Sequence, residues 1–243
     1  MFVALIVLAS AAAQINPPAR PLDVTVVVPL CDGTKLACGR GVAGDPRSLE
    51  GNLYWGAMYG AERFLAKAKG FRVLNRTDAP DPQRPGLLRV VVIERAPIGR
   101  ERAVRLTLEA WDGAQIDAAL AAFFAAARAP SSDLLVWAGH DRIMDVAAPS
   151  GLSGATSSKP VAVLACESER YFGPALAAAG ARPVALTRTF MAPEAYLLEA
   201  LASSVARNGV EDRVQLRASL IEAYAKFQRI SPKAASSVFS KLE

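Results

Sequence analysis

Two short apolar runs, each followed by a chemically active side chain, decide the fold: Leu134-Leu135-Val136-Trp137-Ala138-Gly139-His140 and Val161-Ala162-Val163-Leu164-Ala165-Cys166. Uninterrupted apolar runs of this length are typical of strands that are buried on both faces of a parallel sheet. The pattern therefore predicts His140 and Cys166 just beyond the ends of two strands. Neighbouring strands lie about 4.8 Å apart, so both side chains would emerge at the same edge of the sheet.

Further strands and helices alternate on both sides of these runs. Strands are predicted at residues 24–30, 72–75, 87–93, 104–111, 133–138, 160–165 and 183–187, and helices at residues 45–70, 114–128, 168–179, 193–208 and 211–229. This alternation favours an α/β fold in which helices cover both faces of a mainly parallel sheet. Ligands bind such sheets beyond the carboxyl ends of the strands, where the strand order reverses. The loops after residues 30, 138, 165 and 187 would meet there.

The helix expected at residues 45–70 has clear signals at its start. Asp45 is a favoured residue before a helix, and Pro46 is tolerated in the first turn. Apolar side chains then recur at helical spacing: Leu53, Tyr54, Trp55, Met58 and Tyr59. We interpret them as a helix face in the core rather than as a ligand site.

The composition indicates one globular domain. The chain has 243 residues, of which 52% are hydrophobic, enough to bury a core of ordinary size. We expect residues 22–230 to form this domain and residues 231–243 to be a tail that adds a helical turn or two. Basic residues exceed acidic ones by five, but they form no run and do not interleave with aromatic residues, so nucleic acid is not an expected partner.

The first residues predict export. Residues 2–13 are apolar and uncharged, and Ala11 and Ala13 supply the small-residue pattern that signal peptidase accepts. We therefore expect a signal peptide at residues 1–13 and a periplasmic or secreted protein with no stable membrane insertion after its removal. The alternatives are a buried first strand or a misassigned start codon. The spacing of Cys31 and Cys38 permits a local disulfide in an oxidising compartment, which agrees with export.

His140 and Cys166 are the residue types that nucleophilic catalysis requires. A thiol beside an imidazole can lose its proton to the ring and attack a carbonyl carbon. Gly139 would let a substrate approach closely, and its N–H could help to stabilise an oxyanion. The alternative is that Cys166 packs as a small hydrophobic residue and that His140 is solvated or capping.

These residues resemble a family of cysteine endopeptidases. A strand followed by Gly139-His140 and a strand followed by Ala165-Cys166, with Glu167 and Ser168 after it, is similar to the caspase, gingipain and clostripain superfamily. The resemblance implies a caspase-like three-layer sandwich in which His140 is the general acid/base and Cys166 the nucleophile. It also implies a peptide or protein substrate and no metal or organic cofactor. Asp141 stands where a second glycine is common in these peptidases.

The whole chain also resembles a group of exported bacterial proteins of unassigned function. Three segments carry this resemblance: Asn52-Leu53-Tyr54-Trp55-Gly56-Ala57, Gly139-His140-Asp141, and Met191-Ala192-Pro193-Glu194-Ala195-Tyr196.

Substrate-binding candidates lie next to the two expected catalytic residues. The loop after the first strand helps to form a substrate pocket in the peptidases, so the resemblance implies that Asp32 pairs with a basic substrate side chain. The alternative is that Asp32 caps a turn with Gly33. Gly139, Asp141 and Glu167 complete the expected substrate contacts.

We expect a cysteine peptidase or a related amide hydrolase from this arrangement. The alternative is a non-catalytic ligand- or protein-binding domain on the same scaffold, in which His140 and Cys166 only line a pocket. Oxidoreductase chemistry between Cys166 and the other two cysteines is a third interpretation, but the sequence has no C-x-x-C pair. It also lacks a common zinc-binding pattern and a phosphate-cradling glycine motif. The oligomeric state stays open.

Overall fold

The computed structural model describes residues 20–78, 81–129, 131–153 and 158–242, so the predicted signal peptide lies outside the described residues. The strands are β1 (Leu22–Pro29), β2 (Phe71–Asp78), β3 (Leu87–Arg95), β4 (Val104–Trp111), β5 (Leu134–Ala138), β6 (Pro160–Leu164) and β7 (Arg182–Ala185). The α-helices are α1 (Ala61–Leu65), α2 (Ile116–Ala127), α3 (Ser168–Ala178), α4 (Tyr196–Asn208), α5 (Arg213–Gln228) and α6 (Pro232–Ser236). Short 3-10 helices span Gly41–Gly44, Gly113–Gln115 and Arg142–Met144.

All of these strands belong to one mixed sheet with the order β2-β3-β4-β1-β5-β6-β7. Strands β4, β1, β5, β6 and β7 are parallel, whereas β3 is antiparallel to both of its neighbours. The expected α/β fold with a mainly parallel sheet is therefore confirmed. The strand order reverses at β1, because the chain places β4 on one side of β1 and later β5 on the other.

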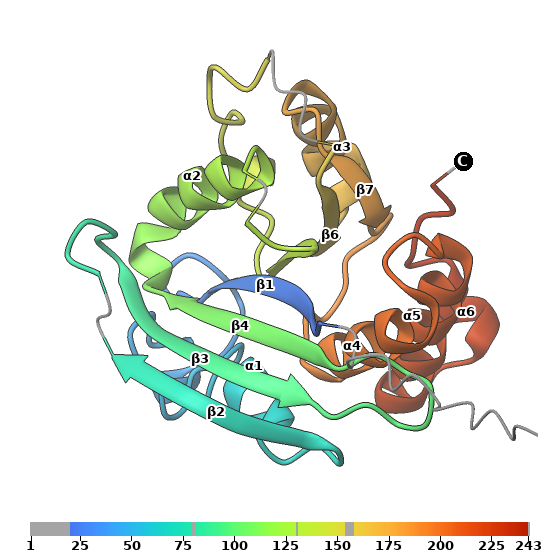
Figure 1. The fold of residues 1–243 in the computed structure, drawn as a ribbon. Helices are drawn as coiled ribbons and strands as arrows, with labels where there is room; N and C mark the ends of the chain where they lie inside the picture. Colours follow the sequence, from blue (N-terminus) through green and yellow to red (C-terminus); the bar gives the residue numbers. More distant parts are fainter. Residues whose placement is uncertain (1–19, 79–80, 130, 154–157, 243) are drawn as a thin grey trace, which may run out of the picture.

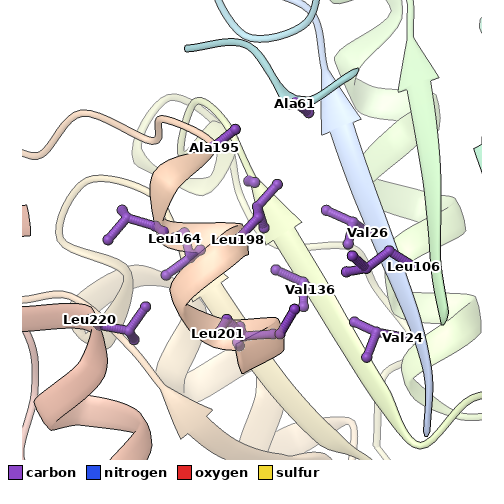
Figure 2. Close-up of a cluster of buried hydrophobic side chains, with 14 of the residues drawn as sticks. Val24, Val26, Ala61, Leu106, Val136, Leu164, Ala195, Leu198, Leu201 and Leu220 are labelled. Atoms are coloured by element: carbon purple, nitrogen blue, oxygen red, sulfur yellow. The ribbon is translucent and has the colours of Figure 1, made fainter. Parts of the chain in front are cut away.

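Helices cover both faces of the sheet and give the molecule three layers (Figure 1). Helices α1, α4, α5 and α6 pack on one face, where Leu198 of α4 lies near Val136 of β5 (Figure 2). Helices α2 and α3 cover the other face, which includes Val27 and Trp137. Successive residues of a strand point to opposite faces, so β1 and β5 contribute to both cores. Burial on both faces explains why their sequences are almost entirely apolar.

The prediction of a long helix at residues 45–70 is wrong over most of that range. Residues 45–60 form successive turns, and only α1 is helical. The buried side chain of Asn52 accounts for the difference. Its oxygen accepts hydrogen bonds from the N–H groups of Cys31 and Tyr54 at 3.0 and 3.1 Å. Its amide donates to the carbonyls of Cys31 and Asp45, both at 2.8 Å. These bonds tie the segment to the end of β1, and they outweigh the helical periodicity.

The C-terminal residues pack against the domain. Val238 and Phe239 are 7% and 2% exposed and belong to the core beneath α4 and α5. Phe239 also forms an antiparallel bridge with Thr187 in the loop after β7. Within the part of the chain that the structure describes, no helix is long and apolar enough to cross a membrane.

Candidate active site

The carboxyl ends of β1, β5 and β6 meet at the edge of the sheet where the strand order reverses. Ala138 of β5 is paired with Leu164 of β6, and His140 and Cys166 each lie two residues beyond this pair. The two candidate catalytic residues therefore leave neighbouring strands at the same height. The N–H of Gly139 donates to the carbonyl of Leu164 over 3.3 Å, so the sheet itself uses the N–H that was expected to stabilise an oxyanion.

The His140 ring is held by an acidic residue of its own loop. Its Nε2 lies 2.6 Å from Oδ2 of Asp145, and the His140 side chain is 17% exposed. Arg142 donates to the same oxygen over 3.4 Å and forms two further hydrogen bonds with Asp117 of α2. The main chain is fixed as well, because the Trp137 indole donates to the His140 carbonyl over 2.9 Å. A carboxylate partner of this kind orients an imidazole and stabilises its protonated form.

The Cys166 thiol is half-buried and contacts the main chain of Met191. The Met191 N–H donates to Sγ over 3.4 Å, and the Met191 carbonyl oxygen lies 3.6 Å from the sulfur. Burial raises the pKa of the Cys166 thiol, and the negative charges of Asp141 and Glu167 raise it further, against the opposing effect of the Met191 hydrogen bond. At rest and at neutral pH, the sulfur is therefore a neutral thiol.

A buried hydroxyl pair fixes the turn that leads from β6 through Cys166 into α3. Ser168 Oγ lies 3.1 Å from Oγ1 of Thr187, and this threonine hydroxyl donates to the carbonyl of Ala165. Glu167 adopts a left-handed conformation, with φ 46° and ψ 32°. That conformation costs a residue other than glycine roughly 1 kcal/mol, which the surrounding contacts must offset. The position of Cys166 is thus set by a strained but well-supported turn.

Asp141 has a fully buried carboxyl group, follows His140 directly in the sequence and acts through its charge on the Cys166 thiol. Its Oδ1 accepts a hydrogen bond from the Ile143 N–H over 3.0 Å, whereas Oδ2 has no partner among the described residues. Burial raises the pKa of Asp141 to about 7, and the negative charges of Asp145 and Glu167 contribute to the rise. Asp141 therefore changes its charge near neutrality, next to the thiol whose pKa it influences.

His140 and Cys166 share an edge, but no hydrogen bond joins them in the described structure. The ring contacts Asp145, and the thiol contacts Met191. Transfer of the Cys166 proton to His140 therefore requires one of the two side chains to turn toward the other. The expected catalytic pair stays a prediction.

Two of the residues expected to bind substrate, Asp32 and Gly139, have structural roles within the protein. Oδ1 of Asp32 accepts hydrogen bonds from the N–H and the hydroxyl of Thr34 at 3.0 and 2.6 Å, and the Lys35 ammonium lies 3.3 Å from Oδ2. Burial acts to raise the pKa of Asp32, but the hydrogen bonds from Thr34 and Lys35 lower it overall. At Gly139, a Cβ would lie 3.0 Å from Cγ of Pro29. The missing side chain thus serves the close approach of β5 and β1.

Two tyrosines that the sequence analysis did not assign to the site lie near Cys166. Burial raises the pKa of Tyr54 to about 12, and the charge of Cys166 adds to the rise. Burial also raises the pKa of Tyr224, whose hydroxyl accepts a hydrogen bond from the Ala192 N–H over 3.2 Å. Both phenols stay neutral and can donate hydrogen bonds. No local sequence signal links them to Cys166, because they come from distant parts of the chain.

Cys31 and Cys38 form a disulfide, with their Cα atoms 6.1 Å apart, and Cys166 is the free cysteine. The described residues include no group of three or more histidine, cysteine, aspartate or glutamate side chains that could hold a metal ion. The thiol chemistry of this edge therefore depends on Cys166 alone.

Comparison with known proteins gives no relative from which a function could be transferred. The chain matches no family model, no curated protein and no solved structure. The resemblance to caspase-like peptidases accordingly stays a prediction, and the function is argued from the residues of the edge.

Proposed function

We propose that the protein is a cysteine-dependent hydrolase of peptide or related amide bonds, built on a caspase-like scaffold. Cys166 is the nucleophile and His140 the general acid/base. The observation that carries the proposal is their matched position, each two residues beyond the paired residues Ala138 and Leu164 of adjacent parallel strands. Asp145 supports the role of His140, because a carboxylate at 2.6 Å orients the ring and stabilises the charge that it gains with a proton.

The chemistry proceeds in two steps. His140 takes the proton of Cys166 as the sulfur attacks the carbonyl carbon, and the amine then leaves with that proton. Water next attacks the thioester, His140 accepts the water's proton and returns it to the sulfur, and the acid is released. Burial raises the pKa of the thiol, so the thiolate forms only when the proton is taken. The Met191 N–H, 3.4 Å from Sγ, stabilises the negative sulfur.

We also propose that the protein works outside the cytoplasm, in the periplasm or as a secreted protein. The Cys31–Cys38 disulfide supports this location, because disulfides persist in oxidising compartments. The apolar sequence of residues 2–13 supports it independently.

The test is the reaction of Cys166 with iodoacetamide and with an activated acyl ester. Under non-reducing conditions Cys166 is the cysteine that can react, because Cys31 and Cys38 are bonded. His140→Ala should slow both reactions at least about tenfold near neutral pH, since the ring then no longer takes the proton. Mass spectrometry should find the acyl group on Cys166 in the wild type and none in Cys166→Ser. Equal rates in wild type and His140→Ala would refute the catalytic pair.

A second candidate function is a non-catalytic binding domain on the same scaffold. One observation favours it: the His140 ring is paired with Asp145 and not with the thiol. In that case His140→Ala leaves the reactivity of Cys166 unchanged, no acyl adduct forms, and peptide amides are not hydrolysed. The same labelling experiment therefore separates the two functions.

A further inference from the structure

A basic cavity lies away from the catalytic edge, beneath the antiparallel side of the sheet. It is open to solvent, has a volume of about 430 Å³, and is lined by residues of the 49–56 segment, of α1 and the turn after it, and of strands β2 and β3. Figure 1 shows α1 beside these two strands. Four basic side chains line the cavity, Arg63, Lys67, Arg76 and Arg89, against two acidic ones.

The floor of the cavity is a buried and fully engaged carboxylate. Glu62 is 8% exposed and accepts hydrogen bonds from the Trp55 indole at 2.7 Å, from Arg76 Nε at 2.5 Å and from Arg89 Nη1 at 3.1 Å. Nε and Nη2 of Arg89 donate hydrogen bonds to Asp78. Glu62 thus holds two guanidinium groups in place, and its charge is already paired with both of them.

The remaining basic groups of the cavity have little to bind within the protein. The Lys67 side chain forms no hydrogen bond or ion pair with the described residues, and the Arg63 side chain forms only a long hydrogen bond, 3.5 Å, with the Gly56 carbonyl. Arg76 uses its Nε on Glu62, which leaves its two terminal nitrogens without a partner among the described residues. Arg63 lies in α1 and Lys67 lies two residues beyond its end, and the two like charges repel each other because they line the same cavity.

We propose that this cavity binds a small molecule carrying a multiply charged oxyanion, a phosphate ester or a polycarboxylate. The donors of Arg63, Lys67 and Arg76 bind the anionic group, and Leu49 and Ala66 contact the organic part. Two features support this ligand class. The Arg76 guanidinium, which Glu62 already holds, loses little freedom when it binds an oxyanion. A multiply charged anion also relieves the repulsion between the unpaired cations, which a single carboxylate would do only in part.

Even with Asp78 counted among the acids, the basic groups around the cavity remain in excess. Cation-binding is therefore disfavoured, and the proposal makes no use of Cys166 or His140. The anion-binding proposal is therefore independent of the hydrolase proposal.

The test is calorimetric titration of the full chain with pyrophosphate and, separately, with citrate, at a physiological ionic strength of about 0.15 M. We expect at least one of them to bind with a dissociation constant below about 1 mM. Tighter binding of pyrophosphate identifies a phosphate site, and tighter binding of citrate a carboxylate site. The variant Arg63→Ala/Lys67→Ala should bind at least about tenfold more weakly.

The matched control is Lys69→Ala/Arg100→Ala, which removes two exposed charges outside the cavity. It should bind the anion as the wild type does. All four substituted residues are exposed, so folding is not at risk, and a thermal melt of each variant checks this. Absence of binding of both anions, or an equal loss of affinity in the cavity variant and the control, would overturn the proposal.

Discussion

Nε2 of His140 and Oδ2 of Asp145 face each other at 2.6 Å across a single loop. Arg142 braces this pair, because its guanidinium contacts Asp145 and also forms two hydrogen bonds with Asp117 of α2. The orientation of the ring therefore depends on the helical layer as well as on β5. All of these groups are at least partly exposed, so their contribution to stability is small. Their role is to hold the ring in one position.

Asp145→Asn should therefore lower acyl-enzyme formation at Cys166 without unfolding the protein. The amide keeps a hydrogen-bonding oxygen, but it does not stabilise a protonated ring, so we expect a loss of about tenfold or more. The measurement is the rate at which an activated ester acylates Cys166, followed by mass spectrometry. Asp23→Asn, which changes a carboxylate at the amino end of β1 and thus at the opposite edge of the sheet, is the control. A wild-type rate in Asp145→Asn would show that the carboxylate has no part in the chemistry.

The two carboxylates beside the thiol should set the pH at which Cys166 reacts. The charges of Asp141 and Glu167 both raise the pKa of Cys166, so Asp141→Asn and Glu167→Gln should each shift the midpoint of alkylation to lower pH. The measurement is the iodoacetamide rate as a function of pH. Glu169→Gln, an equivalent change two residues along the chain from Glu167, should leave the midpoint in place. Unchanged midpoints in both edge variants would show that neither carboxylate affects the pKa of the thiol.

Asp141 should also make stability depend on pH. Its pKa is about 7 in the folded protein and near 3.9 in an unfolded chain, so the folded state holds an extra proton between these values. Stability from this group is complete below about pH 4 and is lost as the pH rises through 7. Relative to wild type, Asp141→Asn should therefore gain about 2 kcal/mol of unfolding free energy between about pH 5 and about pH 8.

Urea denaturation at the two pH values measures this gain. Asp117→Asn is the control, because the Arg142 hydrogen bond lowers the pKa of Asp117 and its titration lies in the acid range. Its unfolding free energy relative to wild type should not change between the two pH values. A pH-independent difference between Asp141→Asn and wild type would show that Asp141 is ionised in the folded protein.

The sheet could be predicted from the sequence because its signals are local. The apolar runs of β1, β5 and β6 are buried on both faces, a pattern typical of parallel strands between two helical layers. The antiparallel placement of β3 could not be predicted in this way. Its direction is set by its pairing with β2 and β4. The hydrophobic pattern of a strand is the same whether the strand runs parallel or antiparallel to its neighbours.

The candidate site was predictable only in part. The sequence places His140 and Cys166 at one edge, since strand ends are visible as the ends of apolar runs. Their partners Asp145 and Met191 are set by the course of loops, which periodicity does not describe. The position of Tyr54 near Cys166 could not be predicted either, because it depends on turns in a segment where a helix was expected.

Asn52 ties residues 45–60 to the end of β1, where a helix was expected, and its removal should lower the stability. Asn52→Ala leaves the N–H and carbonyl of the buried Cys31 without partners, so we expect the unfolding free energy to fall by about 3 kcal/mol. Asn52→Asp keeps the acceptor but points a carboxylate at two carbonyls, and it should be at least as harmful. Asn208→Ala, at the exposed end of α4, should be nearly neutral. Urea denaturation measures all three, and a loss in Asn52→Ala no larger than in Asn208→Ala would show that the turns at residues 45–60 hold without the Asn52 side chain.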